Sequence, residues 1–501
     1  MKFRSTRGDS EELRAAQAII RGIAPDRGLY VPEEIPEMPY DIKAIWNGGD
    51  SAEMISSATY QDIAKKIIGA FFTDCTEEEI GACVDGAYDS KFDTEEIAPL
   101  VQAGDAWFLE LYHGKTAAFK DMALSILPRL LTTAVKKEQD DSKICILTAT
   151  SGDTGKAALE GFADVPGTEI TVFYPDSGVS EVQERQMVTQ TGGNTHVFAV
   201  KGNFDDAQTG VKNAFQNEAF AAELGKKGIK LSSANSINIG RLIPQCVYYV
   251  WSYISMIRKG AVKPGEKINI VVPTGNFGNI LAAYYAKLMG LPVNRLICAS
   301  NKNKVLTDFI RTGVYDTDRE FYLTNSPSMD ILISSNLERL LYHLSGDNAE
   351  EIAKLMAELD ADHHYEVSDK IKNSLTDFYG GFADVDATNK TIGEVYKENG
   401  YLLDTHTAVA YKVYEQYRRE TEDETPTVIA STASPYKFAK SVADSIGLDE
   451  QPDGFAYIRE IAEKTGVTVP EGLRDLDKKE IRHRGVINTD EIEKTVLSLF
   501  E

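Results

Sequence analysis

The order of hydrophobic and polar positions along the chain changes near residue 105. Before that point, apolar residues recur at helical spacing in segments 11–23 and 51–72, which predicts two amphipathic helices. Segment 28–36 lies between them, is bounded by prolines and is expected to be extended. The N-terminal part of the chain is therefore predicted to be mainly helical.

Beyond that point, short runs rich in β-branched residues alternate with helical patterns, which predicts parallel sheets covered by helices on both faces. The polar stretch 300–425 and a peripheral tail, 440–501, are expected to be mostly helical. The expected strands are 107–111, 143–147, 169–174, 195–200, 229–233, 267–272 and 427–430. The expected helices between them are 116–131, 155–163, 180–191, 205–224, 241–258 and 280–289.

Composition and charge narrow the class of protein. The chain has 501 residues, of which 43% are hydrophobic and 26% are charged, as in an ordinary globular protein of about three domains. Its 53 basic residues are outnumbered by 77 acidic ones, which gives a net charge of −24. Such a surface repels polyanions, so nucleic acid and anionic membranes are not expected as partners.

The sequence shows no clear targeting or metal-binding pattern. No apolar stretch reaches the roughly eighteen residues of a membrane-spanning helix, and no secretory signal is recognised. The five cysteines form no C-x-x-C pair and are interpreted as reduced core residues of a cytoplasmic protein. The seven histidines lack metal-ligand spacing, so no metal site is expected; His406 is interpreted as a packed core histidine.

The first candidate site is a glycine-rich turn after the strand expected at 267–272. Its glycines permit a tight backbone, and its N–H groups together with a helix N-terminus form a cradle for an anion. Because the turn contains no Lys or Arg, it suits a permanently bound phosphate monoester. A purely structural turn is the alternative. The residues of the turn are Gly275, Asn276, Phe277, Gly278 and Asn279.

The second candidate is a hydroxyl-rich turn after the strand expected at 143–147. It is not a P-loop, because Thr150 stands where glycine is needed and Ala157 where a hydroxyl is needed. Its N–H and hydroxyl groups suit a carboxylate, although a simple helix N-cap by Ser151 or Asp153 is equally compatible. The turn includes Ser151, Gly152, Asp153 and Thr154.

The third and fourth candidates are a lysine and a hydroxyl. Lys120 lies in HGKTAAFKD, one turn into the helix expected at 116–131, among apolar neighbours. A desolvated lysine is what Schiff-base chemistry requires; the alternative is a surface lysine whose stem lies along the helix. Thr432 follows the strand expected at 427–430 and could hydrogen-bond a ring nitrogen, with a plain turn as the alternative.

Together the four turns describe one cofactor. A lysine for an aldehyde, a glycine loop for a phosphate and a hydroxyl for a ring nitrogen match pyridoxal 5′-phosphate. None of the turns is decisive by itself.

At these residues the chain resembles the threonine synthase family, pyridoxal-phosphate enzymes that convert O-phospho-L-homoserine and water to L-threonine and phosphate in the last step of threonine biosynthesis. The resemblance covers nearly the whole chain and is loosest between 300 and 395 and after 450. It rests on segments in family order: STRG, GLYVPEEIP, HGKTAAFKD, ATSGDTGKAA, YPDSGVSEVQERQM, GNFDDAQ, SANSINIGRLIPQ, PTGNFGNILA, LLDTHTAVA and STASPYKF.

The resemblance implies an α/β fold of the tryptophan-synthase-β-like kind, fold type II of the pyridoxal-phosphate enzymes. Two parallel-sheet α/β domains and a helical N-terminal domain are then expected. The N-terminal domain would be 1–95 and the small α/β domain 133–234. The large cofactor-binding domain would be 96–132 and 235–501, with a helical insertion at about 300–425. The protein would be a cytoplasmic monomer or dimer with a small-molecule substrate.

The resemblance also implies residue roles. Lys120 would be the catalytic Schiff-base lysine, and Thr432 would face the pyridine nitrogen of the cofactor. The cofactor phosphate would lie on Gly275, Asn276, Phe277, Gly278 and Asn279. The substrate carboxylate and the ring hydroxyl of the cofactor would lie near Ser151, Gly152, Asp153 and Thr154. The substrate phosphate would be held by Asn238, Arg241 and Lys115, since arginine can grip phosphate with two hydrogen bonds.

Two other functions remain open from the sequence. A pyridoxal-phosphate-dependent phospho-lyase or dehydratase would share Lys120 and the glycine loop but would release 2-oxobutanoate. A non-catalytic protein that binds a phosphorylated metabolite could use the same turns, but it would be colourless and its Lys120 would be unreactive.

Overall fold

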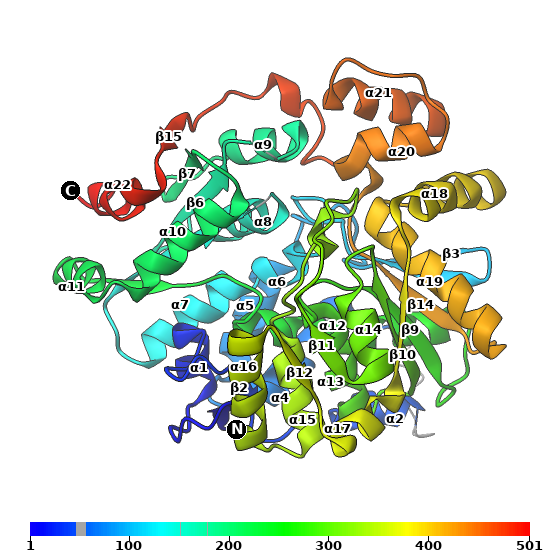
Figure 1. Cartoon of the computed structure of the whole chain (residues 1–501), viewed down its shortest axis with the longest axis horizontal. Coiled ribbons are helices and arrows are strands. Elements are labelled where there is room, and N and C mark those ends of the chain that lie inside the picture. Colours follow the sequence, from blue (N-terminus) through cyan, green and yellow to red (C-terminus); the bar gives the residue numbers. More distant parts are fainter. Residues whose placement is uncertain (47–56, 151, 178) are drawn as a thin grey trace.

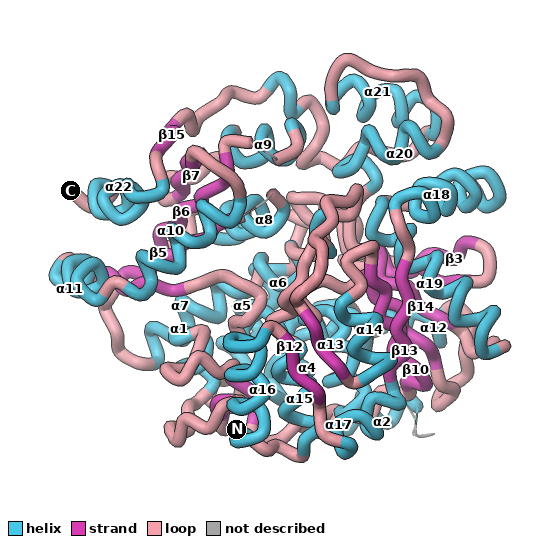
Figure 2. Tube along the Cα trace, viewed as in Figure 1, coloured by secondary structure: helices cyan, strands magenta, loops and turns pink. Residues whose placement is uncertain are grey.

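The molecule is built around two separate β-sheets. A computed structural model describes residues 1–46, 57–150, 152–177 and 179–501. Figure 2 shows the strands of these two sheets at the upper left and at the right, with helices around both. Among the described residues, none of the helices combines the length and the apolar character needed to span a bilayer.

The larger sheet has six strands in the order β13-β10-β9-β14-β4-β3. Its strands are parallel except for the edge strand β3, which runs antiparallel to β4. Every residue of the central strand β9 is buried, as expected for a sheet covered on both faces. The strands are β3 (Leu100–Ala103), β4 (Ala106–Glu110), β9 (Ile268–Pro273), β10 (Val293–Ser300), β13 (Phe378–Phe382) and β14 (Thr427–Ser431). The helices that contact this sheet include α12 (Ile239–Arg258), α13 (Gly278–Met289), α14 (Val305–Thr312) and α19 (Thr405–Thr421).

The smaller sheet has five parallel strands in the order β15-β7-β6-β5-β8. Its strands are β5 (Lys143–Ala149), β6 (Thr168–Pro175), β7 (Thr195–Val200), β8 (Ile229–Ser232) and β15 (Gly485–Ile487). The helices that contact it or lie beside it are α8 (Asp153–Phe162), α9 (Glu181–Val188), α10 (Phe204–Gln216), α11 (Glu218–Lys226) and α22 (Ile492–Ser498).

The N-terminal part is mainly helical, as the apolar spacing predicts. Its helices include one that packs against α12, a helix of the larger sheet. Thr6 and Arg7 of the STRG segment tie it to Glu338: Arg7 Nη2 lies 2.8 Å from Glu338 Oε2. Its elements are β1 (Phe3–Ser5), α1 (Ala15–Arg21), β2 (Tyr30–Pro32), α2 (Tyr40–Trp46), α4 (Tyr60–Phe71) and α5 (Glu77–Ala87). The first residues of the helix expected at 51–72 lie outside the described residues.

The remaining helices and two short strands lie in the segments that connect the strands of these sheets. They are α6 (Asp121–Leu124), α7 (Leu127–Lys137), β11 (Val314–Asp316), α15 (Leu337–Ser345), α16 (Ala349–Asp362), β12 (His364–Glu366), α17 (Asp369–Ser374), α18 (Val385–Asn399), α20 (Ala439–Ser445) and α21 (Gly454–Thr465). Residues 300–425 are mostly helical as expected, but they also contain β13, an edge strand of the larger sheet.

Three expectations differ from the structure. The single helix expected at 116–131 is a turn followed by α6 and α7, and the one expected at 205–224 is divided into α10 and α11. The expected large domain included all of residues 235–501, but β15 near the C-terminus pairs with β7 of the smaller sheet. In Figure 1 the red C-terminal segment accordingly lies beside β7 and α10.

Candidate active site

The predicted turns meet at the carboxyl ends of the strands, where ligands bind in open α/β sheets. Backbone pairing joins two of them: the N–H of Phe119 donates to the carbonyl of Thr432 at 2.8 Å, and the N–H of Ser434 donates to the carbonyl of Ala117 at 3.0 Å. The chain before Lys120 is thus held against the chain after β14, although the two are more than 300 residues apart in sequence.

Lys120 lies immediately before α6, not one turn inside a helix as predicted. Its side chain is not a surface lysine, since the residue is only 9% exposed. Nζ lies 3.5 Å from Asp153 Oδ2 and donates to Ser328 Oγ at 3.2 Å. Burial lowers the pKa of Lys120; Asp153 opposes the shift, whereas the charges of Lys437 and Arg241 add to it. A lysine with a lowered pKa is a better nucleophile and base at neutral pH.

The turn before Lys120 is held in shape by Asp121. Asp121 Oδ2 accepts from the backbone N–H of Thr116 at 2.8 Å, and Oδ1 accepts from the Thr116 hydroxyl at 2.7 Å. Burial raises the pKa of Asp121 to about 6 despite these hydrogen bonds. The turn also places Ala117 at a φ of 56°, a left-handed conformation uncommon for alanine.

The glycine-rich turn fits a phosphate. It leads from β9 into α13, whose first N–H groups have no partner within the helix. The side-chain nitrogen of Asn279 is buried and, within the described part of the chain, has no hydrogen-bond partner, whereas its oxygen accepts from Tyr248 at 2.9 Å. A Cβ on Gly275 would lie 2.4 Å from the carbonyl oxygen of Ser328, so only glycine fits there. An anion on the turn would supply the acceptor that Asn279 lacks.

Thr432 is buried directly after β14, beside the turn that carries Lys120. A hydroxyl at this place is a neutral partner, which can hydrogen-bond a pyridine nitrogen without fixing a proton on it. The arrangement of lysine, glycine turn and hydroxyl therefore has the parts that pyridoxal phosphate requires.

Asp153 comes from the smaller sheet's side of the centre and contacts Lys120. It is the first residue of α8, with Gly152 as the cap residue, so Asp153 does not act as the N-cap. Its Oδ1 lies 2.8 Å from Lys437 Nζ and accepts from Gln183 Nε2 at 2.9 Å. Burial opposes ionisation, but Lys437 and Lys120 hold the pKa of Asp153 far below its usual range.

Of the other residues predicted in the hydroxyl-rich turn, the structure describes two. Gly152 has a φ of 144°, and a Cβ there would meet the Gln183 side chain at 2.6 Å. Thr154 is half-buried on the first turn of α8, whereas Ser151 lies outside the described residues.

The three residues predicted to hold the substrate phosphate have different surroundings in the structure. Arg241, in the first turn of α12, is 4% exposed; Nη1 donates to the carbonyl of Ala234, whereas Nε has no hydrogen-bond partner among the residues that the structure describes. Burial lowers the pKa of Arg241 to about 10, which still leaves it charged at neutral pH. Asn238 instead caps α12 through Gly240 and donates to the carbonyl of Ile19 at 3.0 Å. Its side chain therefore has structural partners.

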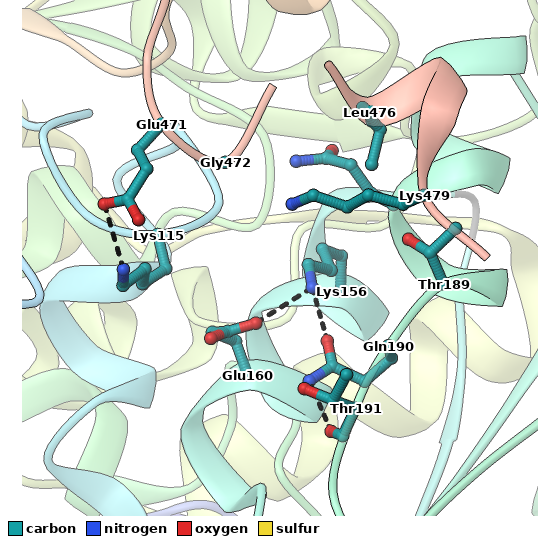
Figure 3. Close-up of a pocket in the computed structure, with 11 residues that line it drawn as sticks. Lys115, Lys156, Glu160, Thr189, Gln190, Thr191, Glu471, Gly472, Leu476 and Lys479 are labelled. Carbon is teal, nitrogen blue, oxygen red and sulfur yellow. Dashed lines mark hydrogen bonds and ion pairs between the residues drawn. The ribbon is translucent and has the colours of Figure 1, made fainter. Parts of the chain in front are cut away.

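Lys115 lies apart, in a cavity of about 250 Å³ between α8, α9 and the segment 471–479. Figure 3 shows Lys115 paired with Glu471, at 3.1 Å, and Lys156 paired with Glu160 on the same cavity. Gln186 lines this cavity and also accepts from Lys437 at 2.7 Å, so the cavity adjoins the network around Asp153.

Sequence patterns did not indicate several residues of the centre. Ser328, Gln183 and Lys437 contact Lys120 or Asp153, and their own segments carry no glycine loop or nucleophile signature. Gln183 and Lys437 do lie in YPDSGVSEVQERQM and STASPYKF, two segments that carry the family resemblance, and this was the available signal for them. Among the described residues, no group of three or more His, Cys, Asp or Glu side chains could hold a metal ion.

Comparison with known proteins gives the class first. The family described as pyridoxal-phosphate dependent enzyme matches residues 93–433, which include all four turns. Together with the two-sheet architecture and the buried lysine, this defines a pyridoxal-phosphate-dependent enzyme of fold type II.

The two ends of the chain identify the family more closely. Residues 2–88 match the threonine synthase N terminus, and residues 407–496 match the C-terminal part of threonine synthase. Threonine synthase of Pseudomonas aeruginosa is 38% identical over 466 residues, which is 93% of this chain and 94% of that protein. The chain belongs to the threonine synthase family.

Two solved structures agree with this assignment. The structure of pyridoxal-phosphate-bound threonine synthase from Brucella melitensis has a TM-score of 0.86 and 35% identity, and the match covers 99% of each chain. That of threonine synthase from yeast has a TM-score of 0.87 and 31% identity, covering 100% of this chain and 98% of that one. Pyridoxal 5′-phosphate is thus the cofactor, and the enzyme is a lyase.

Proposed function

We propose that the protein converts O-phospho-L-homoserine and water to L-threonine and phosphate, with Lys120 as the catalytic residue. The observation that carries this proposal is the position of Lys120: it is buried, its pKa is lowered, and it lies where the four turns meet. When bound, pyridoxal phosphate supplies an electron sink for negative charge that develops on the substrate carbons.

The geometry supports the following assignment of the residues that would hold the cofactor. Lys120 would bind its aldehyde, and the turn 275–279 its phosphate, with the unpartnered nitrogen of Asn279 as one donor. Thr432 would hydrogen-bond the ring nitrogen. Asp153 lies on the other side of Lys120 and would interact with the ring hydroxyl, aided by Lys437.

The substrate would lie between the smaller sheet and α12. Its carboxylate would lie on the turn that contains Gly152 and Thr154, at the N-terminus of α8. Its phosphate would be held by Arg241, whose buried Nε lacks a partner. Asn238 and Lys115 are not included in this grip, because one is a helix cap and the other pairs with Glu471 in a separate cavity.

In this arrangement Lys120 would act as the base. As a free amine it would take the α-proton of the substrate and, once it has passed that proton on, would take a proton from Cβ. Arg241 would stabilise the phosphate as its bond to Cγ breaks and phosphate leaves. Water would then add its hydroxyl group at Cβ, its remaining proton would go to the released phosphate, and Lys120 would return one proton to Cγ and one to Cα, so that L-threonine and phosphate are the products. Burial of Lys120 limits the entry of water before that step.

The domain division and the location complete the proposal. We infer a helical N-terminal domain, a large cofactor domain and a small domain built on β5–β8, the last carrying the C-terminal residues 485–498 as well. A cytoplasmic location is favoured by five cysteines that are all free thiols, four of them buried. The substrate is a small molecule, and a monomer or dimer without nucleic-acid or membrane partners is proposed.

An absorption spectrum with product analysis tests the proposal. The purified enzyme should show a visible cofactor band that is lost in Lys120→Ala, and it should release threonine and phosphate in equal amounts from O-phosphohomoserine. Release of 2-oxobutanoate instead of threonine would retain the site but assign the activity to a phospho-lyase. A protein that cannot take up pyridoxal phosphate would contradict the role of Lys120.

A further inference from the structure

We propose that His406 is a positioning residue that aims the amine of Lys120 by fixing Ser328. The inference rests on the proposed role of Lys120 as the base and adds residues beyond the four turns. Its observations are a continuous set of hydrogen bonds that runs from Asp404 through His406 and Ser328 to Lys120.

The first step is the state of the imidazole. The backbone N–H of Ser328 donates to Nε2 of His406 at 3.2 Å, and a ring nitrogen that accepts carries no proton. Nδ1 must then hold the proton, and it lies 3.1 Å from Oδ1 of Asp404. Nε2 of His406 therefore accepts from the loop while Nδ1 faces its carboxylate partner, an arrangement that orients an imidazole ring.

The second step is the rigidity of this pair. His406 is 4% exposed and Asp404 is 1% exposed. Asp404 caps α19 by accepting from the backbone N–H groups of His406 and Thr407, at 2.8 and 3.3 Å. The ring of Phe438 lies 4.7 Å from the imidazole, centre to centre. The acceptor nitrogen is thus held by a helix end and by packing, so its position is set by the fold.

The third step is the loop that His406 holds. Ser328 lies in the short 3-10 turn Pro327–Met329, and its carbonyl faces Gly275 of the phosphate turn. The base of the loop is anchored separately by Asp330, which accepts from Asn301 and Asn303 at 2.7 and 3.0 Å. His406 is therefore the side chain that fixes the tip of the loop, where the hydroxyl meets Lys120.

The last step concerns the lysine. A neutral amine has two N–H bonds and one lone pair. Ser328 Oγ accepts one N–H at 3.2 Å, and Asp153 Oδ2 lies 3.5 Å from the same nitrogen on the other side. With both N–H bonds directed to these oxygens, the lone pair has one remaining direction. His406 acts through Ser328 and does not contact the reacting atoms itself, because its Nε2 is occupied by the N–H of Ser328.

The test compares holoenzyme variants. His406→Asn keeps a polar side chain near Asp404 but cannot reach Ser328, whereas His406→Gln can place an amide oxygen near the position of Nε2. Ser328→Ala removes the acceptor of Lys120. We expect His406→Asn and Ser328→Ala each to lower kcat by about tenfold to a hundredfold, the cost of a slightly misplaced catalytic group, with KM changed less than kcat. His406→Gln should recover most of the loss.

Two readouts separate positioning from a general structural role. The double variant, His406→Asn with Ser328→Ala, should be no slower than the slower single variant, because both remove the same contact. The visible circular dichroism of the bound cofactor should change alike in both single variants. His343→Asn is the control: His343 is a half-buried histidine hydrogen-bonded to the hydroxyl of Tyr285 at 2.9 Å, away from Lys120, and the kcat of this variant should be unchanged.

Several outcomes would overturn the inference. They are multiplicative losses in the double variant, an unchanged kcat in His406→Asn, or a loss in His406→Gln as large as in Ser328→Ala. If His406→Asn does not fold, the comparison of His406→Gln with Ser328→Ala still decides, since only the latter should be slow. Failure of the proposed function is recognised independently, because the unsubstituted enzyme would then release no threonine or Lys120→Ala would remain active.

Discussion

At the scale of single residues, the centre is a group of buried charges that determine one another's ionisation. Asp153 lies between Lys120 and Lys437, at 3.5 and 2.8 Å from their nitrogens. The negative charge favours the ammonium form of Lys120, whereas Lys437 and burial favour the free amine. Asp153 and Lys437 therefore shift the pKa of Lys120 in opposite directions.

The first prediction uses this opposition. Asp153→Asn should lower the pKa of Lys120, because it removes the charge that favours the ammonium form, and Lys437→Met should raise it, because it removes a like charge. Each substitution should move the pKa by about one pH unit. The measurement is the rate at which cofactor-free protein takes up pyridoxal phosphate as a function of pH, since only the free amine reacts.

The control is Glu160→Gln, also on α8, whose carboxylate pairs with Lys156 at 2.9 Å. The midpoint of its pH profile for cofactor uptake should move less than the midpoint of either Asp153→Asn or Lys437→Met. Shifts of the same sign for Asp153→Asn and Lys437→Met would show that the pair does not set the ionisation of Lys120.

A second residue-scale prediction concerns His113. Its Nδ1 lies 2.5 Å from Asp93 Oδ1 and its Nε2 lies 2.9 Å from Glu110 Oε2. Burial lowers the pKa of His113, but the hydrogen bonds to the two carboxylates outweigh it and raise the pKa to about 9. Because this lies above the ordinary value of about 6.5, the contribution of His113 to stability is complete below about pH 6.5 and is lost as pH rises through about 9.

Urea unfolding of the native chain and of His113→Gln measures this contribution. The difference in unfolding free energy should shrink between pH 6 and pH 9.5, by at most about 3 kcal/mol. A difference that is constant with pH would mean that the imidazole is not charged in the folded protein.

At the scale of elements, the segment before Lys120 shows what the sequence could and could not predict. Its apolar residues left a surface lysine and a buried lysine open, and the structure shows that Lys120 is buried. The Schiff-base role that the resemblance implies for Lys120 stays a prediction. The periodicity predicted one helix over 116–131, whereas residues 117–119 form backbone hydrogen bonds with 432–434. Such a long-range pairing leaves no local pattern, so the turn could not be predicted. Ser328 was missed for the same reason, because only the fold brings it to Lys120.

The glycine-rich turn gives the element-scale prediction. Gly275→Ala would place a Cβ 2.4 Å from the Ser328 carbonyl, so the phosphate turn and the 328 loop would have to separate. A strain of about 1–3 kcal/mol is typical of such overpacking, and we expect cofactor affinity to fall by about tenfold or more. Titration of cofactor-free protein with pyridoxal phosphate measures the loss.

Gly69→Ala is the matched control. Gly69 lies within α4, and a Cβ there would have no atom within 4 Å. Cofactor affinity should then be unchanged, and stability should rise by up to about 1 kcal/mol, because alanine favours helix. An affinity in Gly275→Ala equal to that of the control would show that the contact with Ser328 is not needed to form the phosphate turn.

At the scale of the whole molecule, the chain does not divide into consecutive blocks. The five-stranded sheet ends with β15, so residues near the C-terminus complete a sheet that begins at β5. The alternation of strands and helices predicted both sheets correctly in outline. A three-residue strand such as β15 has no sequence pattern of its own, because its partner β7 is almost 300 residues away.

The tail is therefore predicted to stabilise the smaller sheet in particular. Ile492 and Val496 of α22 are fully buried in a cluster with Val200, Val211 and Phe220. Ile492→Ala should cost about 2–5 kcal/mol, the usual range for a buried isoleucine truncated to alanine. Val486→Ala is the control in the same segment, since Val486 is 55% exposed, and it should cost less than about 0.5 kcal/mol.

Hydrogen exchange measured strand by strand decides whether this effect is local. If the tail stabilises mainly the smaller sheet, Ile492→Ala should speed hydrogen exchange in β7 and β6. Exchange in β9 of the larger sheet should be the same in Ile492→Ala and in Val486→Ala, because locally weakened units open before the rest of a protein does. Because Asp153 of α8 reaches Lys120 from this sheet, the same variant should also loosen the contact at the active centre. Equal acceleration in β7 and β9 would mean that the two sheets unfold as one unit, and the tail would then stabilise the molecule as a whole.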